Sequence, residues 1–555
     1  MAFGSALSVE VDSTSARKSR GAFFTPPLLT EYICRWAIRS KTDKVLEPAC
    51  GEAEFLLAAA HRFEEIGLGR SCLKENLTGL ELHAESVTEA RKRMAANGVS
   101  CNVMRGDYLL SDFEGCFDAV VGNPPYVRFQ SLDRAQKEGC RRVSQKSGVE
   151  ISALSSLWVP FVIQSALSLK SGGRIGLVLP SELLSVNYAA PVRKFLLSSF
   201  AEIRLITFEE RVFPEVQEEV VLLLAEGYGR GGSNKINWIQ CSNARDIDRV
   251  SPLDYTPKTS DARWTGLFAS EASVCLLESF LNQGEFALLS DWGKVSLGVV
   301  TGNNKYFALT DADVARNGLA DDVIDLCPPG SSHLRRTSFD SSDLSRLGQL
   351  GKRTKLFYPQ GGSISKSAES YINEGCVSGV EKGYKCRKRS PWWRVPLVKP
   401  PDAFVTYMNA FGPNICWNVA RVPNLNSCHG LYLRDDVAVV DPSLLAIASF
   451  NSVTMFGAEL RGRSYGGGLL KLEPREASLL PVPSPKLVEE AANELRSVKK
   501  YVDAAFEKGD YETAVSVVDA VLSSRTGHAS DYVQLGSSAA LMRLRRAKRA
   551  KKVDS

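Results

Sequence analysis

Asn123, Pro124, Pro125 and Tyr126 form the stretch of this chain whose residue types best suit chemistry. The preceding residues 117–122 are mostly apolar and predict a short buried strand that ends at Gly122. Each proline restricts the residue before it, so the loop should be stiff. The Asn123 amide offers a donor and an acceptor, and the Tyr126 ring follows at once. Such a loop could hold a planar amino-bearing group and stack a ring on it, although it could also be a plain turn.

A second candidate site follows an expected strand at residues 45–46. Its loop begins with Glu47, continues through Ala49, Cys50 and Gly51, and opens a helix. With one glycine it lacks the GxGxxG pattern, which argues against a dinucleotide and leaves room for a smaller nucleoside at the helix N-terminus. A carboxylate at Glu47 would repel phosphate but could accept from an ammonium. These properties suit S-adenosylmethionine (SAM), which carries an ammonium and a cationic sulfonium.

Two more carboxylates end the strands expected next along the chain. Glu81 closes a strand at residues 78–82 and is placed to accept from ribose hydroxyls. Asp107 follows a strand at residues 101–104 and could accept from the adenine amino group. Each alone could be a solvated loop residue, but three in register at successive strand ends favour a ligand site.

The elements that must position these residues alternate between strands and helices. Thr25 is predicted to cap a helix at residues 28–37, with Pro26 in its first position. The strands that follow are separated by helical segments, the order of a doubly wound sheet. We therefore predict a Rossmann-like α/β domain at residues 1–245, with its ligand loops at the carboxyl ends of the strands.

The ordered motifs of this region resemble those of a known family, the adenine-specific (N6) DNA methyltransferases of type II restriction–modification systems. The motifs are residues 21–27, 47–55, Glu81, Asp107 and 123–126, and the likeness continues through residues 157–161, 172–181, 213–214 and 220–224. Their order is that of the gamma arrangement, in which the cofactor loop precedes the catalytic loop and the target recognition domain comes last. The chain departs from the family at Glu52 and Glu54, where small residues are usual.

The resemblance implies the roles of these residues. Binding of SAM is assigned to Thr25, Glu47, Ala49, Cys50, Gly51, Glu81, Asp107 and Asn123. Catalysis is assigned to Asn123, Pro124, Tyr126 and Phe213. The Asn123 side-chain oxygen and the Pro124 carbonyl would hold the two protons of the adenine amino group, while Tyr126 and Phe213 would stack on a base flipped out of the duplex.

From about residue 240 the character of the chain changes. We place the domain boundary between a glycine-rich stretch at residues 227–235 and a polar connection at residues 251–265. Residues 246–484 predict a strand-rich α+β domain whose opening, residues 288–307, resembles that of a target recognition domain. Residues 485–555 predict two or three helices that end in a basic run.

The strongest indication of nucleic-acid binding in this second part is a basic stretch at residues 382–399. It interleaves cations with aromatic residues, which suits phosphates and bases, although a basic surface strand with core tryptophans would show the same composition. A later stretch resembles a family segment near the end of the recognition domain. The predicted DNA-binding residues are Lys385, Arg387, Lys388, Arg389, Trp392, Trp393, Arg461, Arg463 and Lys471.

Composition restricts the remaining possibilities. The 13 cysteines include no CxxC pair, so we expect no zinc ribbon and no disulfide framework. The chain shows neither a signal pattern nor an apolar run long enough for a bilayer, so we expect a cytoplasmic enzyme of a bacterium or archaeon, working at the nucleoid. We expect double-stranded DNA as substrate, a monomer, no metal, and a separate cognate restriction endonuclease that cleaves unmodified sites.

Two alternatives stay open. The same loop occurs in enzymes that methylate a protein glutamine amide or a guanine amino group in RNA, although these need no recognition domain of this length. A methyltransferase-like DNA-binding protein without activity is the other alternative, and the presence of Asn123, Tyr126, Asp107 and Glu81 argues against it.

Overall fold

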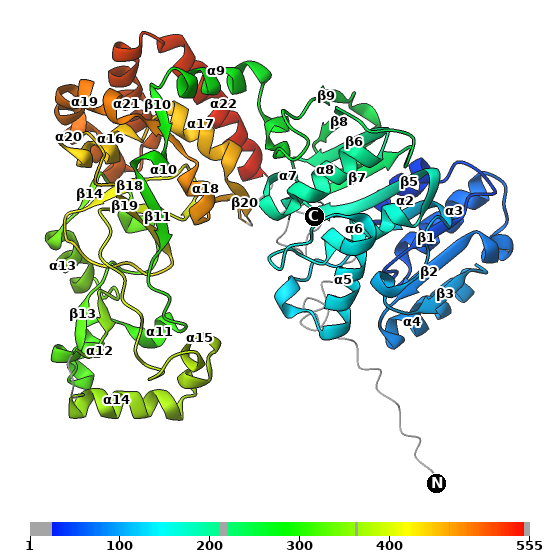
Figure 1. Cartoon of the computed structure of the whole chain (residues 1–555), viewed down its shortest axis with the longest axis horizontal. Coiled ribbons are helices and arrows are strands. Elements are labelled where there is room, and N and C mark those ends of the chain that lie inside the picture. Colours follow the sequence, from blue (N-terminus) through cyan, green and yellow to red (C-terminus); the bar gives the residue numbers. More distant parts are fainter. Residues whose placement is uncertain (1–24, 211, 213–218, 361–363, 466, 549–555) are drawn as a thin grey trace. The chain divides into compact units, whose positions relative to one another are not determined.

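The structure is a computed structural model that describes residues 25–210, 212, 219–360, 364–465 and 467–548 (Figure 1). The chain divides into two compact units. Unit 1 runs through Leu267 and takes in residues 465–467 and the chain after Leu544, whereas unit 2 comprises Phe268–Ser464 and Gly468–Leu544.

Unit 1 is built on one mixed β-sheet, which has nine strands within the described residues, in the order β3-β2-β1-β4-β5-β7-β6-β8-β9. Strands β3 to β5 of that order are parallel, and β7 is antiparallel to both of its neighbours. The strands are β1 Val45–Glu47, β2 Leu77–Glu81, β3 Asn102–Arg105, β4 Phe117–Gly122, β5 Leu169–Pro180, β6 Glu202–Phe208, β7 Val220–Glu226, β8 Ile236–Cys241 and β9 Leu253–Tyr255.

α-Helices precede β1 and separate β1 from β2, β2 from β3, β4 from β5 and β5 from β6 in the sequence (Figure 1). The first three of these strand pairs are parallel neighbours, which need such a crossover. The helices are α2 Pro27–Ala37, α3 Glu54–Glu65, α4 Ala84–Ala96, α5 Arg134–Ser147, α6 Trp158–Leu167, α7 Glu182–Ser185 and α8 Ala190–Ser199. Helices α2 and α3 bury Leu29, Ile33, Phe55 and Leu56 in a core shared with β1 and β4. The Rossmann-like α/β fold predicted from the sequence is confirmed.

The strand order reverses direction at β1. The chain proceeds from β1 outward to β2 and β3, then returns to place β4 on the other side of β1. In open α/β sheets, ligands bind at such a reversal, beyond the carboxyl ends of the strands. The loops that follow β1 and β4 are therefore those best placed to form a ligand site.

Unit 1 extends past residue 245, the boundary expected from composition. Strand β9 pairs with β8, and the buried Arg193 guanidinium donates to the carbonyls of Asp261 (3.1 Å) and Ala262 (2.7 Å). Because these bonds hold the polar connection against α8, residues 246–267 belong with the first unit.

Unit 2 contains a sheet in the order β11-β19-β16-β18-β14 and smaller two- and three-stranded sheets. Its strands are β10 Phe286–Leu288, β11 Gly293–Leu297, β12 Ala308–Leu309, β13 Val323–Asp325, β14 Ser338–Phe339, β15 Lys355–Phe357, β16 Ala403–Thr406, β17 Met408–Asn409, β18 Ile415–Asn418, β19 Cys428–Leu433, β20 Arg463–Tyr465, β21 Leu469–Lys471 and β22 Pro481–Pro483.

Helices pack around these sheets. They are α9 Glu271–Asn282, α10 Leu289–Trp292, α11 Asn304–Phe307, α12 Asp311–Asn317, α13 Ser341–Gln349, α14 Lys366–Val377, α15 Tyr384–Arg387, α16 Leu445–Ala448, α17 Ser452–Arg461, α18 Pro474–Ser478, α19 Pro485–Glu490, α20 Ala492–Lys508, α21 Tyr511–Thr526 and α22 Ala529–Lys548. Helices α20 and α21 share one apolar core with β11 and β16. The chain through Leu544 therefore belongs to unit 2, rather than forming a separate segment from residue 485.

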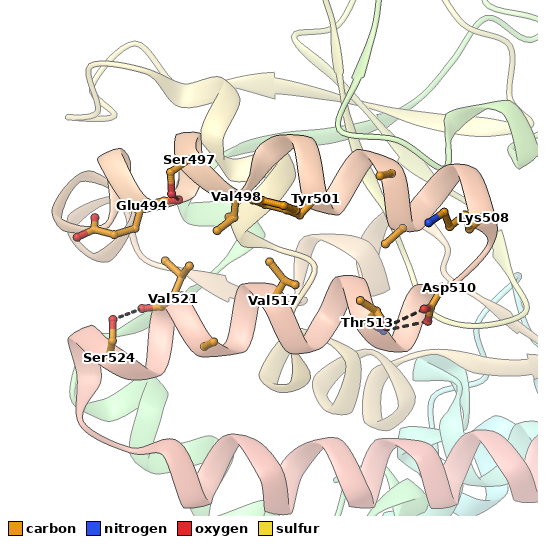
Figure 2. Close-up of a pocket in the computed structure, with 13 residues that line it drawn as sticks. Glu494, Ser497, Val498, Tyr501, Lys508, Asp510, Thr513, Val517, Val521 and Ser524 are labelled. Carbon is orange, nitrogen blue, oxygen red and sulfur yellow. Dashed lines mark hydrogen bonds between the residues drawn. The ribbon is translucent and has the colours of Figure 1, made fainter.

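A hollow of about 680 Å³ lies between α20 and α21, and Figure 2 shows the residues that line it. Val498, Tyr501, Val517 and Val521 contribute to its lining, and no predicted site residue does. The hollow therefore has no part in the chemistry inferred from the sequence.

Asp519 links α21 to α17 and makes the stability of unit 2 depend on pH. Its carboxylate accepts from the Ser452 amide (2.8 Å) and hydroxyl (2.6 Å). Burial raises the pKa of Asp519 to about 6, above the roughly 3.9 of an unfolded aspartate. The folded protein therefore binds this proton more tightly, and the resulting stabilisation is complete below about pH 4 and lost as the pH rises through about 6.

Replacing Asp519 by asparagine should remove this pH dependence. We expect the Tm of D519N, relative to that of wild type, to rise as the pH is raised from about 5 to about 7. Over this range the folded wild type loses the Asp519 proton, whereas asparagine has no proton to lose. Thermal melting followed by circular dichroism at both pH values measures it. The same Tm difference between D519N and wild type at both pH values would contradict the raised pKa of Asp519.

Candidate active site and nucleic-acid surface

The loop after β4 presents a buried acceptor, the side-chain oxygen of Asn123. The Asn123 side-chain nitrogen Nδ2 donates to the hydroxyl of Thr25 at 3.2 Å. Its oxygen Oδ1 is buried and has no hydrogen-bond partner among the described residues. A buried acceptor without a partner is costly, so Asn123 Oδ1 at this strand end is a candidate to bind a ligand donor.

Thr25 has a different local role from the predicted helix cap. Helix α2 begins at Pro27 with Pro26 as its cap residue, and no side chain caps it. Pro26 and Pro27 carry no N–H to which Thr25 could bond. The buried Thr25 hydroxyl instead bonds to Asn123, which lies 98 residues further along the chain.

Pro124 and Tyr126 lie in the same loop as Asn123. Pro124 is buried, and the Tyr126 hydroxyl donates to the Val178 carbonyl of β5 at 3.1 Å. The half-buried Tyr126 ring is thereby anchored to the neighbouring strand. Phe213, the second predicted aromatic, lies outside the described residues.

Glu81 anchors the loop after β1 through a hydrogen bond. The Glu81 carboxylate, at the end of β2, accepts from the amides of Gly51 (3.0 Å) and His83 (2.9 Å). Gly51 has a left-handed backbone (φ +47°), and a Cβ added there would meet no heavy atom of the described residues within 4 Å. Within that part of the chain, the space over Gly51 is open. Of the neighbouring predicted residues, Ala49 is half-buried, whereas Cys50 is buried, with its amide bonded to Leu80.

Glu47 is more enclosed than its predicted role requires. It is 3% exposed, and its carboxylate accepts from the Leu56 amide at 2.9 Å, in the first turn of α3. Burial raises the pKa of Glu47 well above its usual range, and the nearby Glu81 adds to this effect. Glu47 thus contributes to the start of α3, and an approaching cation would favour its ionised form.

Asp107 lies in the loop after β3. It is half-buried, and its carboxylate accepts from the Leu109 amide at 3.0 Å. Burial raises the pKa of Asp107, opposed by that hydrogen bond. Asp107, Glu81, Glu47 and Asn123 follow one another at the carboxyl ends of adjacent parallel strands β3, β2, β1 and β4. The structure therefore aligns them along one edge of the sheet.

The basic stretch of unit 2 separates into an exposed part and a buried part. Lys385, Arg387 and Lys388 are exposed around α15, together with Tyr384, whose exposed fraction is 64%. The ammonium groups of Lys385 and Lys388 lie 5.8 and 6.0 Å from the centre of the Tyr384 ring. This exposed ring was absent from the predicted contacts, although its place among lysines is visible in the sequence.

The other predicted residues of that stretch are structural. The Arg389 guanidinium donates to the carbonyls of Val300 and Thr301, the latter at 2.8 Å. Trp393 is buried in a hydrophobic core, and Trp392 packs on Tyr306 with ring centres 5.6 Å apart. For the tryptophans, the alternative of core packing describes the structure better than exposed stacking platforms.

The later basic residues are also engaged within unit 2. Arg463 pairs with the buried Glu476 at 2.8 Å, and Lys471 pairs with Glu473 at the same distance. A phosphate contact by either would compete with an existing ion pair. Arg461 is half-buried at the end of α17.

A metal centre and a membrane-spanning helix are two further features to consider within the described residues. No group of three or more His, Cys, Asp or Glu side chains could hold a metal ion in that part of the chain. No single helix there is long and apolar enough to cross a bilayer, whereas the bent pair 442–448 and 452–461 meets the length and composition criteria. Most residues of that pair lie in the core of unit 2.

Comparison with known proteins gives matches for both units. A family model described as Eco57I restriction-modification methylase matches residues 71–213, and a model of the C-terminal domain of the type II methyltransferase M.Eco57I matches residues 261–523. The chain is 25% identical to the type II methyltransferase M.AccI of Acinetobacter calcoaceticus and 25% identical to M.XamI of Xanthomonas campestris pv. amaranthicola, in each case over 84% of this chain and 85% of the relative.

A solved structure shares the fold of the chain. It is that of the type IIL restriction-modification enzyme MmeI in complex with DNA, with a TM-score of 0.56, 11% identity, and coverage of 93% of this chain and 75% of that chain. The two family models and the two relatives agree, and the chain belongs to the DNA methyltransferases of type II restriction–modification systems.

Proposed function

We propose that this DNA methyltransferase transfers a methyl group from SAM to the 6-amino nitrogen of an adenine that is flipped out of duplex DNA. The observation that carries the proposal is the buried Asn123 oxygen at the end of β4, which has no hydrogen-bond partner among the residues that the structure describes. This oxygen can accept a hydrogen bond, and the adenine amino group is a planar donor with two protons.

The chemistry depends on holding that amino group. Its lone pair is delocalised into the adenine ring, which makes the nitrogen a weak nucleophile. Acceptors at Asn123 Oδ1 and the Pro124 carbonyl would bind both protons and favour a tetrahedral nitrogen directed at the methyl donor. Positioning and electrostatic stabilisation supply most of such a rate enhancement, so no strong base is required.

The residues of the sheet edge suit SAM. When bound, SAM supplies an electrophilic methyl group on a sulfonium. The free space over Gly51 accommodates a ligand beside the start of α3. Glu81 and Asp107 would accept from the ribose and the adenine amino group, and Glu47 from the ammonium. Thr25, Ala49 and Cys50 would complete the walls.

Unit 2 would bind the duplex. Lys385, Arg387 and Lys388 would meet phosphates, and the exposed Tyr384 ring would contact a base or sugar. Flipping an adenine costs roughly a few kcal/mol, of which stacking on Tyr126 could recover about 1–3 kcal/mol. The order of the cofactor loop, the catalytic loop and the recognition unit is the gamma arrangement. The proposed enzyme acts as a monomer and protects host sites from a separate endonuclease.

Thr25 is expected to orient the catalytic amide. Thr25→Val removes the acceptor of the Asn123 side chain while keeping the shape of residue 25. The freed amide can rotate, so we expect kcat to fall roughly tenfold, which corresponds to the free energy of about one hydrogen bond. Thr25→Ser retains the hydroxyl and is the control, with SAM affinity measured separately for both. Equal kcat values for the two variants would exclude this role.

Sequencing that detects modified bases, on DNA from cells that express the chain, tests the proposed function. The expected result is N6-methyladenine within one recurring sequence motif, absent from cells that express the inactive Asn123→Ala variant. Methylation of cytosine instead would refute the adenine assignment. The absence of any modified motif, together with no transfer of labelled methyl groups to DNA in vitro, would refute the proposal as a whole.

A further inference from the structure

The cofactor loop has an unusual backbone between β1 and α3. Gly51 and Ala53 both have left-handed conformations, with φ of +47° and +70°. A left-handed backbone suits glycine but is unfavourable for alanine. Among the described residues, Arg421 is the one other non-glycine residue with positive φ. Such a conformation persists where surrounding contacts impose it.

Arg93 of α4 makes two such contacts, one on each side of Ala53. One guanidinium nitrogen, Nη1, donates to the Glu52 carbonyl at 2.8 Å. The other, Nη2, lies 2.7 Å from the Glu54 carboxylate in the first turn of α3. The Arg93 and Glu54 side chains are 31% and 19% exposed, so solvent screens the pair only in part. A planar guanidinium that bridges these two groups restrains Ala53 between them.

The rest of the loop is anchored from the sheet. The Gly51 amide bonds to Glu81 of β2, and the Leu56 amide bonds to Glu47 of β1. Arg93, on α4, contacts Glu52 and Glu54, which lie between these two anchored residues. It therefore holds the part of the loop beside the open space over Gly51.

Charge gives Arg93 a second effect. Glu47, Glu52, Glu54 and Glu81 surround the loop, and the methionine part of SAM carries a carboxylate as well as an ammonium. An unpaired Glu54 at the start of α3 would repel that carboxylate. Pairing with Arg93 offsets this charge, which explains how the chain tolerates an acid where the family usually has a small residue.

We propose that Arg93 is a positioning residue for the cofactor: it holds residues 51–54 in the conformation that binds SAM and neutralises Glu54, and so sets SAM affinity rather than the rate of methyl transfer. The proposal rests on the proposed use of SAM. On this proposal, Glu54 does not disrupt the cofactor loop, because its carboxylate is paired with Arg93 and does not face SAM.

The test compares Arg93→Gln with Arg91→Gln in the full-length protein. Arg91 lies on the same helix, but its guanidinium donates to the Val103 carbonyl of β3 at 3.0 and 2.6 Å, so R91Q is a matched loss of charge away from the loop. Hydrogen–deuterium exchange of residues 50–57 without ligand reports the loop, and calorimetry with SAM reports affinity. Kinetics with saturating DNA separate KM for SAM from kcat.

For R93Q we expect faster exchange in the loop and SAM binding weakened by roughly 10- to 100-fold, with kcat at saturating SAM within about twofold of wild type. R91Q should match wild type in all three measurements. Arg93→Lys keeps the positive charge but loses the planar fork that bridges both groups, so its SAM affinity should lie between those of wild type and R93Q, an order that a general loss of stability would not produce.

Three results would overturn the inference while leaving the proposed function intact. They are loop exchange in R93Q as slow as in R91Q, SAM affinity equal in both, and a fall in kcat with KM for SAM unchanged. Failure of the wild type to bind SAM would refute the proposed function instead. Exchange of the ligand-free loop in R93Q and R91Q then still shows whether Arg93 holds it.

Discussion

Asn123→Ala is expected to lower methyl transfer by about 1,000-fold and to leave SAM affinity within about threefold of wild type. The size follows from removing one preorganised group at the reacting centre. The Asn123 oxygen is buried, has no partner among the described residues, and is oriented by the bond from Nδ2 to Thr25. Alanine removes the acceptor and leaves the Gly51 loop, which Glu81 holds, unchanged.

Single-turnover transfer of labelled methyl groups to DNA, with calorimetry for SAM, measures both parts of this expectation. Asn123→Asp is an informative companion, since it keeps an oxygen acceptor but loses the N–H that bonds to Thr25. We expect N123D to be impaired less than N123A. Transfer by N123A at more than about a tenth of the wild-type rate would remove Asn123 from the catalytic centre.

The triple variant K385A/R387A/K388A is expected to weaken binding of duplex DNA by roughly 100-fold or more at low salt. All three side chains are exposed at α15. Loss of up to three phosphate contacts should also lower the slope of log K against log salt by about 2 to 3. Fluorescence anisotropy with labelled DNA at several salt concentrations measures affinity and slope together.

The matched control removes the same charge elsewhere in unit 2. Lys486, Lys500 and Lys508 are exposed on α19 and α20, and K486A/K500A/K508A should leave the slope nearly unchanged. Tyr384→Ala tests the ring separately and should weaken binding with little change in the slope. Equal losses in the two triple variants would show that net charge, and no local surface at α15, governs binding.

Much of unit 1 could be predicted from the sequence because its signals are local. A short apolar strand followed by a stiff or small-residue loop encodes both an element and the residue at its end, as at Asn123 and Glu47. Parallel pairing then places such ends along one edge of the sheet, in the order in which β3, β2, β1 and β4 lie. The fold and the alignment of the candidate site therefore follow from a few short segments.

The second unit shows the limit of composition. A run of cations and aromatic residues indicates a surface, but it cannot separate exposed members from buried ones. Lys385 and Lys388 are exposed, whereas Trp393 packs in a core and Arg389 bonds to backbone carbonyls. Asn414 shows the same limit, since its side chain has the polarity of a surface residue but donates to the carbonyls of Leu334 and Arg336 and is buried. Burial depends on contacts between distant segments, which composition does not report.

The sequence by itself determined the fold class of unit 1, the loop for which catalysis is proposed and the strand ends that carry the acidic residues, because each depends on neighbours within a few positions. Only the tertiary structure decided that Thr25 bonds to Asn123 instead of capping α2, and that Arg93 brackets Ala53 across 40 residues of chain. A hydrogen bond of about 3 Å requires two segments to meet in space. That meeting is a property of the packed sheet and helices, which no local pattern encodes.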